Sequence, residues 1–197
     1  MTLHVPLPII YPITSGNPQT TTGILRFVES VVTAQLPLVQ IREKSLPARA
    51  LYELTKSAME ITRGSKTRLL VNDRFDIARA AGADGVQLTA RSLPADVVRK
   101  ICGPEFLIGV STHSLAEARA AQVAGADFVV FGPIFDTESK RSFGEPQGLG
   151  KLREVTNELG EFPVIAIGGI TRANLAACVA AGASGIAGIS MFERFTP

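Results

Sequence analysis

The chain has 197 residues, of which 46% are hydrophobic and 19% are charged, and its formal net charge is +2. These values are typical of one ordinary globular domain, so we expect residues 1–197 to form a single domain. Such a small net charge, with basic residues scattered along the chain, argues against a nucleic-acid partner. The longest apolar stretches fall well short of the roughly 20 residues that a membrane span needs, so we expect a cytoplasmic protein without membrane association.

Short apolar runs rich in Val and Ile alternate with longer segments of helical periodicity. This pattern is typical of repeated βα units around a parallel sheet. The predicted strands, in chain order, are Ile9 to Ile13, Leu38 to Arg42, Arg68 to Asn72, Gly85 to Leu88, Leu107 to Ser111, Phe128 to Gly132, Val164 to Gly168 and Gly185 to Ser190. Eight such units predict a closed (β/α)8 TIM barrel, with an open doubly wound sheet as the alternative.

A short motif recurs where three of the predicted helices end. Residues 81–84 and 124–127 both read Ala-Gly-Ala-Asp, and residues 181–184 read Ala-Gly-Ala-Ser. Because Gly tolerates the left-handed conformation, we expect each central Gly to end a helix and lead into the next strand. At another helix start, Ser114 and Glu117 have the spacing of a capping box.

The end of the chain departs from the repeated pattern. Only Met191 to Pro197 follow the eighth predicted strand, which is too few for a full outer helix. We therefore expect a short or missing last helix and a partly uncovered apolar flank. Either a second subunit in a homodimer covers this flank or the natural chain is longer.

Polar residues at the ends of the predicted strands are the first candidates for function, because the loops after the strands build the active site in TIM barrels. After the second strand, alternation places Gln40, Arg42 and Lys44 on one side, and two cations there suit an anion. Pairing of Arg42 and Lys44 with Glu43 or with helix carboxylates is an equally good interpretation.

The third strand ends in Asn72, Asp73 and Arg74. The Asp73 carboxylate could bind Mg²⁺, which takes oxygen ligands and usually keeps several waters. From the residues alone, the favoured interpretation is that Asp73 caps the helix that follows.

The fifth strand places Ser111 and His113 at the same rim. The ordinary pKa of a histidine suits general acid–base chemistry near neutral pH, so His113 is a candidate catalytic residue. A hydrogen bond from the His113 ring to the backbone is the alternative.

The sixth and seventh strands are followed by two further candidate sites. The long loop from Phe135 to Gln147 combines hydroxyls, cations and Gly, which suggests a lid over a phosphate, with a solvated loop as the alternative. The two closing strands end in glycines where TIM barrels commonly bind phosphate through backbone N–H groups. The predicted phosphate-binding residues are Gly168, Gly169, Gly188, Ile189 and Ser190. Tight packing is the other reason for glycine at these positions.

Five blocks, taken in order, resemble the thiamine phosphate synthase/TenI family. They are Gln40 to Lys44, Asn72 to Arg74, Gly109 to Ser111, Gly132 to Phe135 with Thr137 to Lys140, and Ala166 to Ile170. The resemblance implies a TIM barrel that binds thiazole phosphate on the closing-strand glycines. It also implies one of two reactions: synthases join hydroxymethylpyrimidine diphosphate to the thiazole with Mg²⁺, and TenI enzymes tautomerise a thiazole carboxylate phosphate.

For a synthase, the resemblance implies a set of contacts to the diphosphate and the pyrimidine. These are Gln40, Arg42, Lys44, Asn72, Ser111 and Lys140, with Gln87, Thr137 and Ser139 as further substrate contacts and Asp73 as a metal ligand. Ser111 and Lys140 are the candidate catalytic residues beside His113.

One segment departs from the synthase pattern. Synthases typically show His-Leu-Gly-Gln-Glu-Asp after the fourth strand, and here residues 87–92 read Gln-Leu-Thr-Ala-Arg-Ser. The second Mg²⁺ carboxylate is thereby replaced by Ser92, and Arg91 adds positive charge, so Mg²⁺ affinity is expected to drop.

Three functions follow from these observations. The leading interpretation is a TenI-like thiazole tautomerase without a cofactor, in which His113 moves the proton. The alternative is a thiamine phosphate synthase that uses Mg²⁺. A noncatalytic binder of thiazole phosphate or thiamin phosphate is the third.

Overall fold

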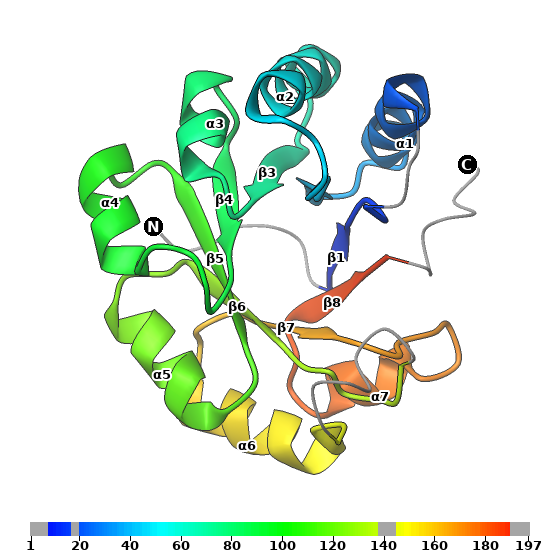
Figure 1. Ribbon diagram of the computed structural model, residues 1–197. Coiled ribbons are helices and arrows are strands. Elements are labelled where there is room, and N and C mark those ends of the chain that lie inside the picture. Colours follow the sequence, from blue (N-terminus) through cyan, green and yellow to red (C-terminus); the bar gives the residue numbers. More distant parts are fainter. Residues whose placement is uncertain (1–7, 17–19, 138–144, 190–197) are drawn as a thin grey trace.

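The computed structural model describes residues 8–16, 20–137 and 145–189, and all eight predicted strands are present (Figure 1). The strands are β1 (Ile9–Pro12), β2 (Leu38–Ile41), β3 (Arg68–Asn72), β4 (Gly85–Leu88), β5 (Leu107–Thr112), β6 (Phe128–Phe131), β7 (Val164–Ile167) and β8 (Gly185–Gly188). The helices are α1 (Thr21–Thr33), α2 (Ala48–Thr62), α3 (Phe75–Ala80), α4 (Ala95–Cys102), α5 (Leu115–Val123), α6 (Gly148–Leu159) and α7 (Leu175–Ala180).

The sheet runs in a circular order and is parallel throughout. Its strands follow one another as β1, β8, β7, β6, β5, β4, β3 and β2. The two end strands meet through a parallel bridge between Ile13 and Gln40, with the Thr14 N–H donating to the Gln40 carbonyl at 3.0 Å. This nearly closed ring confirms the (β/α)8 prediction and excludes the doubly wound sheet.

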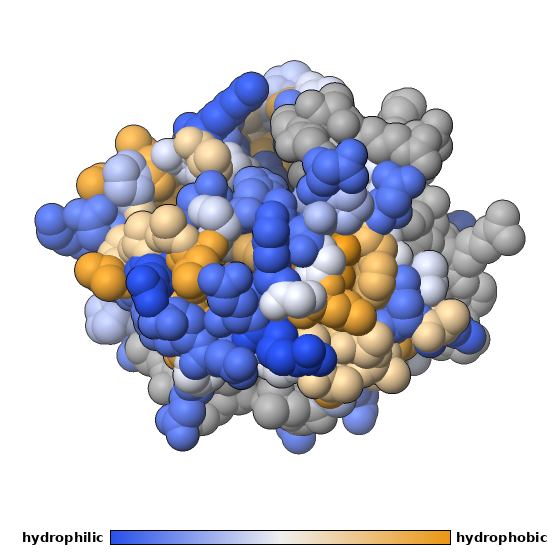
Figure 2. All heavy atoms as spheres, turned by 90° about the horizontal axis from the view of Figure 1, so that it is seen from below, coloured by the Kyte–Doolittle hydropathy of each residue, from blue (hydrophilic) through white to orange (hydrophobic). Residues whose placement is uncertain are grey.

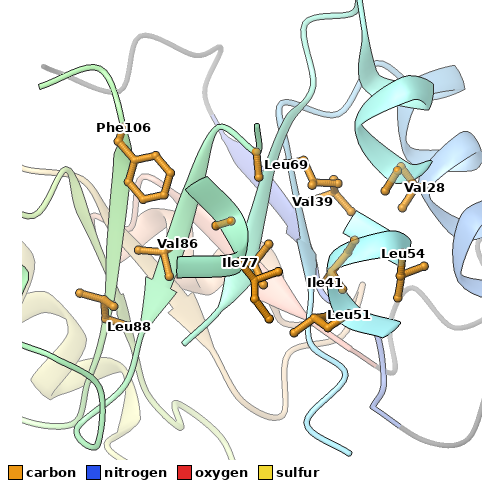
Figure 3. Close-up of a cluster of buried hydrophobic side chains, with 14 of the residues drawn as sticks. Val28, Val39, Ile41, Leu51, Leu54, Leu69, Ile77, Val86, Leu88 and Phe106 are labelled. Atoms are coloured by element: carbon orange, nitrogen blue, oxygen red, sulfur yellow. The ribbon is translucent and has the colours of Figure 1, made fainter. Parts of the chain in front are cut away.

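Buried side chains form two layers, one inside the ring of strands and one outside it. Inside, Tyr11, Phe128 and Ile165 belong to a cluster that fills the barrel. Outside, Ile41 and Leu69 pack against the helices that cover the strands, as Figure 3 shows for the side of β2 to β5. Full burial of one such aliphatic side chain stabilises the fold by about 1.5–3 kcal/mol. Because both faces are covered, the strands read as continuous apolar runs.

The recurring Ala-Gly-Ala motif has the role predicted for it. Gly82, Gly125 and Gly182 follow α3, α5 and α7, with φ values of +75°, +84° and +93°. These left-handed conformations let each helix end and reverse toward β4, β6 or β8.

The polar residue that closes each motif ties two strands together. Asp84 Oδ2 accepts a hydrogen bond from the Leu69 N–H at 2.8 Å, and Asp127 Oδ2 accepts one from the Ile108 N–H at 2.7 Å. In the third copy, the Ser184 hydroxyl accepts from the backbone of β7 at 3.3 Å. Each contact satisfies a backbone donor at the amino-terminal end of the barrel, opposite the predicted active site.

Within the described residues, which end at 189, no helix follows β8. None of the described helices is long and apolar enough to cross a membrane. The face shown in Figure 2 is largely hydrophilic, with hydrophobic residues in smaller groups between the polar ones.

Candidate active site

The carboxyl ends of β2, β3 and β4 border a cleft with a volume of about 290 Å³. We call it the rim cleft. Its polar lining is Glu43 and Lys44 after β2, Asn72, Asp73 and Arg74 at the end of β3, and Thr89 and Arg91 after β4. Three of the predicted substrate or metal contacts, Lys44, Asn72 and Asp73, are therefore brought together here.

Positive charge dominates one part of the rim cleft. The pKa of Lys44 is lowered from its ordinary value, first by partial burial of the ammonium group and then by the positive charges of Arg42 and Arg91. Each of the two arginines therefore lies near enough to Lys44 for their charges to repel. The Asp73 carboxylate acts on Lys44 in the opposite direction.

Among the described residues, no carboxylate forms an ion pair with Arg42, Lys44 or Arg91. Glu43 is buried, and its Oε1 has no hydrogen-bond partner in the described part of the chain. The structure therefore favours an anionic ligand over internal pairing as the reason for the charge.

Asp73 does not cap the helix that follows it. The residue before α3 is Arg74, and no side chain caps that helix. Asp73 instead adopts a left-handed φ of +65°, and its Oδ1 accepts a hydrogen bond from the Ser92 hydroxyl. The capping interpretation is wrong, because the left-handed turn directs the carboxylate toward the segment after β4.

Ser92 is itself held in place by the backbone. Its Oγ accepts a hydrogen bond from the Thr89 N–H at 2.8 Å and lies 3.1 Å from the Thr89 hydroxyl. The serine thus links the ends of β3 and β4 across the rim cleft, where the family pattern has a carboxylate.

Two of the predicted substrate contacts are buried inside the barrel. Gln40 and Gln87 are 1% and 3% exposed, and both bond to the Tyr11 hydroxyl: Gln40 Nε2 donates to it at 2.9 Å, and it donates to Gln87 Oε1 at 3.4 Å. Gln87 Nε2 in turn donates to the Ser111 hydroxyl at 3.1 Å. Sequence reasoning missed Tyr11, although a tyrosine inside an apolar strand usually needs a partner for its hydroxyl.

His113 lines a different hollow. Its Nδ1 lies 2.5 Å from the Gly132 carbonyl oxygen. Because a carbonyl only accepts, Nδ1 carries the proton, and Nε2 of the neutral ring is an acceptor. The hollow, of about 230 Å³, also includes Phe131, which packs outside the ring of strands, and Lys151 of α6.

The start of α5 explains the position of His113. The Glu117 N–H donates to the Ser114 hydroxyl at 3.2 Å, which confirms one half of the predicted capping box. The Glu117 carboxylate accepts from the His113 N–H at 2.8 Å instead of from the Ser114 N–H. His113 therefore lies just before α5, and its ring forms the hydrogen bond to the backbone that was the alternative to a catalytic role. The catalytic role of His113 stays a prediction.

The glycines after β7 are required by packing. Gly168 and Gly169 have φ values of +96° and +64°. A Cβ on Gly168 would lie 2.5 Å from the Pro133 side chain, and one on Gly169 would lie 2.6 Å from the Asp136 carbonyl oxygen. The packing interpretation holds for both residues, and phosphate binding by the same loop stays a prediction.

Some of the remaining predicted residues lie in the described part of the chain and others lie outside it. Gly188 ends β8, where its carbonyl accepts from the Ile13 N–H at 2.9 Å, and Ile189 packs on the cluster inside the barrel. Thr137 is partly buried at the end of a described segment. Ser139, Lys140 and Ser190 lie outside the described residues.

Comparison with known proteins gives a consistent result. Residues 10–192 match the family model described as thiamine monophosphate synthase. The thiamine-phosphate synthase of Moorella thermoacetica is 44% identical over 84% of this chain and 79% of its own length. That of Roseiflexus castenholzii is 39% identical over 96% of this chain and 85% of its own length.

The same family is found among solved structures. Thiamine phosphate pyrophosphorylase from Pyrococcus furiosus superposes with a TM-score of 0.79 and 34% identity, covering 93% of this chain and 86% of that one. A match over most of the chain in sequence and in fold shows that the chain belongs to the thiamine monophosphate synthase family.

Proposed function

We propose that the protein is a thiamine-phosphate synthase that joins hydroxymethylpyrimidine diphosphate to thiazole phosphate. The observation that carries this proposal is the lining of the rim cleft, where Lys44 and Arg91 accompany Asn72, with the positive charge of Arg42 acting on Lys44. A diphosphate needs such a group, whereas a tautomerase has no diphosphate to hold. The names of the relatives support the same choice over the tautomerase that the sequence favours.

In this reaction the bond between the pyrimidine methylene and the diphosphate oxygen breaks, and its electron pair leaves with the diphosphate. The thiazole nitrogen then forms a bond to the methylene carbon. Negative charge grows on the leaving group as the first bond breaks. Cations that are already in place stabilise that charge most strongly in the transition state, which is how Lys44 and the two arginines would accelerate the step.

Mg²⁺, which the family resemblance implies, fits the described residues poorly. No group of three His, Cys, Asp or Glu side chains in the described part of the chain is placed to hold a metal ion. Asp73 Oδ1 is already bonded to Ser92, and the cations that lower the pKa of Lys44 oppose a further positive charge. We therefore assign most of the charge compensation for the diphosphate to Lys44, Arg42 and Arg91.

The tautomerase is the second candidate, and one observation favours it. The Gly132 carbonyl fixes the His113 tautomer so that Nε2 can take up a proton. The hollow beside His113 shares no lining residue with the rim cleft. A proton shuttle at His113 would thus act away from Lys44 and Arg91, which line the rim cleft.

Turnover of purified protein with both substrates tests the proposal. We expect formation of thiamine phosphate with stoichiometric release of pyrophosphate, and a loss of about a hundredfold in kcat/KM for Lys44→Ala, as expected when one preorganised charge is removed. Lys100→Ala is the matched control, because Lys100 lies on α4 and pairs only with Asp96 at 3.5 Å among the described residues. It should keep wild-type activity.

The other outcomes assign the other functions. Tautomer conversion that His113→Ala abolishes, without release of pyrophosphate, would identify a tautomerase. Binding of thiazole phosphate without either reaction would identify a noncatalytic binder.

A homodimer and a cytoplasmic location stay predictions of the sequence.

A further inference from the structure

Four polar side chains form a hydrogen-bonded chain across the inside of the barrel. They come from four different strands: Gln40 of β2, Tyr11 of β1, Gln87 of β4 and Ser111 of β5. Each donates to the next, over distances of 2.9, 3.4 and 3.1 Å. The chain begins inside the barrel, where Tyr11 is fully buried among apolar side chains, and ends at the partly exposed Ser111.

The direction of this chain determines what Ser111 can offer to a ligand. An amide nitrogen only donates and an amide oxygen only accepts, and a phenol has one hydrogen to give. With the amides as they stand, Ser111 receives a hydrogen bond from Gln87, and its own O–H is left to donate. If both amides were turned over, every bond would reverse, and Ser111 would donate inward.

Two neighbours shape the space around the Gln87 amide and the Tyr11 ring. A Cβ on Gly109 would lie 2.4 Å from Gln87 Oε1, so the absence of a side chain at this position makes room for the amide. The Tyr11 ring packs edge-on against Phe128, with a centroid distance of 5.8 Å. Burial raises the pKa of Tyr11, so its hydroxyl keeps the hydrogen that it donates to Gln87.

We propose that Tyr11 and Gln87 are positioning residues that hold Ser111 as a hydrogen-bond donor toward an oxygen of the substrate diphosphate. This inference rests on the proposed function. It adds which residues orient the Ser111 O–H as a hydrogen-bond donor. Without the chain, the Ser111 O–H can turn inward and the donor is lost for part of the time. Preorganised donors act best when they need no reorientation during the reaction.

A double-mutant cycle tests the proposal. We expect Ser111→Ala to lower kcat/KM about tenfold or more, the loss typical of one hydrogen bond to a charged group. Tyr11→Phe keeps the ring and removes only the hydroxyl, and it should cause a similar loss. In the Ser111→Ala background, however, Tyr11→Phe should change kcat/KM by less than about twofold, since the two losses share one cause.

Thr112→Val is the matched control. Thr112 is the next residue of β5, it is 1% exposed, and its hydroxyl has no partner in the described part of the chain. The substitution removes a buried hydroxyl of the same strand without touching the hydrogen-bonded chain. It should leave kcat/KM within about twofold of the wild type.

Gln87→Met keeps the test decisive if Tyr11→Phe does not fold. Met has about the length of Gln but no N–H to donate, so it removes the hydrogen bond to Ser111 without burying a charge. We expect a loss of kcat/KM that shrinks to less than about twofold in the Ser111→Ala background. Wild-type kcat/KM in folded Gln87→Met would overturn the proposal.

The cycle separates failure of the inference from failure of the proposed function. If the wild type forms thiamine phosphate but the two losses multiply, the inference is wrong and the function stands. If there is no turnover, the same cycle is measured on the Kd of inorganic pyrophosphate by calorimetry. Coupled losses of pyrophosphate affinity would then support the positioning role of Tyr11 and Gln87, although the synthase function would be rejected. Additive losses, or no binding of pyrophosphate, would overturn both the positioning role and the synthase function.

Discussion

The Ser92 hydroxyl donates a hydrogen bond to Asp73 Oδ1 across the carboxyl ends of β3 and β4. This pair stands where the family pattern implies two carboxylates around Mg²⁺. The structure thus explains why the departure at residue 92 matters: a neutral hydroxyl occupies one of the oxygens of the remaining carboxylate.

Ser92→Asp should raise the affinity of the rim for Mg²⁺. A second carboxylate beside Asp73 supplies the oxygen ligands and the negative charge that a hard cation prefers. We expect the affinity for Mg²⁺, measured by calorimetry without substrate, to rise by about tenfold or more, which corresponds to about 1.4 kcal/mol. Ser45→Asp, in the exposed turn after β2, adds the same charge as a control. Tight Mg²⁺ binding by the wild type would contradict this prediction.

Pyrophosphate affinity should fall at high pH, and the fall should begin below the ordinary range of a lysine. The pKa of Lys44 is lowered, so its ammonium group loses its proton, and its attraction for an anion, at a lower pH than that of a free lysine. Lys44→Arg carries a charge that does not titrate in this range and should flatten the profile. Calorimetry across the alkaline range measures both proteins, and an identical profile for the two would exclude Lys44 as the titrating group.

The fold could be predicted from the sequence because its signals are local and repeated. Continuous apolar runs marked the strands, and the glycines of the Ala-Gly-Ala motifs marked three helix ends that the structure confirms. The direction of rim side chains was harder to predict. Alternation applies only inside a strand, and β2 ends at Ile41, where the Arg42 N–H bonds to the Thr14 hydroxyl at 2.8 Å.

Long-range contacts account for what the sequence could not show. The His113 ring contacts Gly132, 19 residues away, and Tyr11 bonds to Gln87, 76 residues away. No spacing in the sequence encodes such pairs in a single chain without an alignment. Tyr11 was therefore absent from the predicted site, and Gln40 and Gln87 were predicted only as contacts to the substrate.

Gly109→Ala should destabilise the protein, because the new methyl group has no room. Its Cβ would lie 2.4 Å from both Gln87 Oε1 and the Phe128 ring. Overpacking of this kind costs about 1–3 kcal/mol of unfolding free energy, which urea denaturation measures. Gly150→Ala is the control: it lies in α6 with nothing within 4 Å of the new Cβ, and it should be neutral or stabilise by up to about 1 kcal/mol.

Asp127→Ala should be among the most damaging substitutions far from the active site. Asp127 is 4% exposed, and its Oδ2 accepts from both the Ile108 N–H and the Arg99 guanidinium, each at 2.7 Å. Removal of the carboxylate leaves a buried N–H and a partly buried cation without that partner, which costs about 3–5 kcal/mol of unfolding free energy.

The control for Asp127→Ala is an exposed ion pair on the same helix as Arg99. Asp96 and Lys100 lie 3.5 Å apart on α4, with side chains that are 49% and 79% exposed. Because water already solvates both charges, Asp96→Ala should cost no more than about 1 kcal/mol. Equal losses of urea stability in the two variants would show that the buried contacts of Asp127 do not tie β5 to β6.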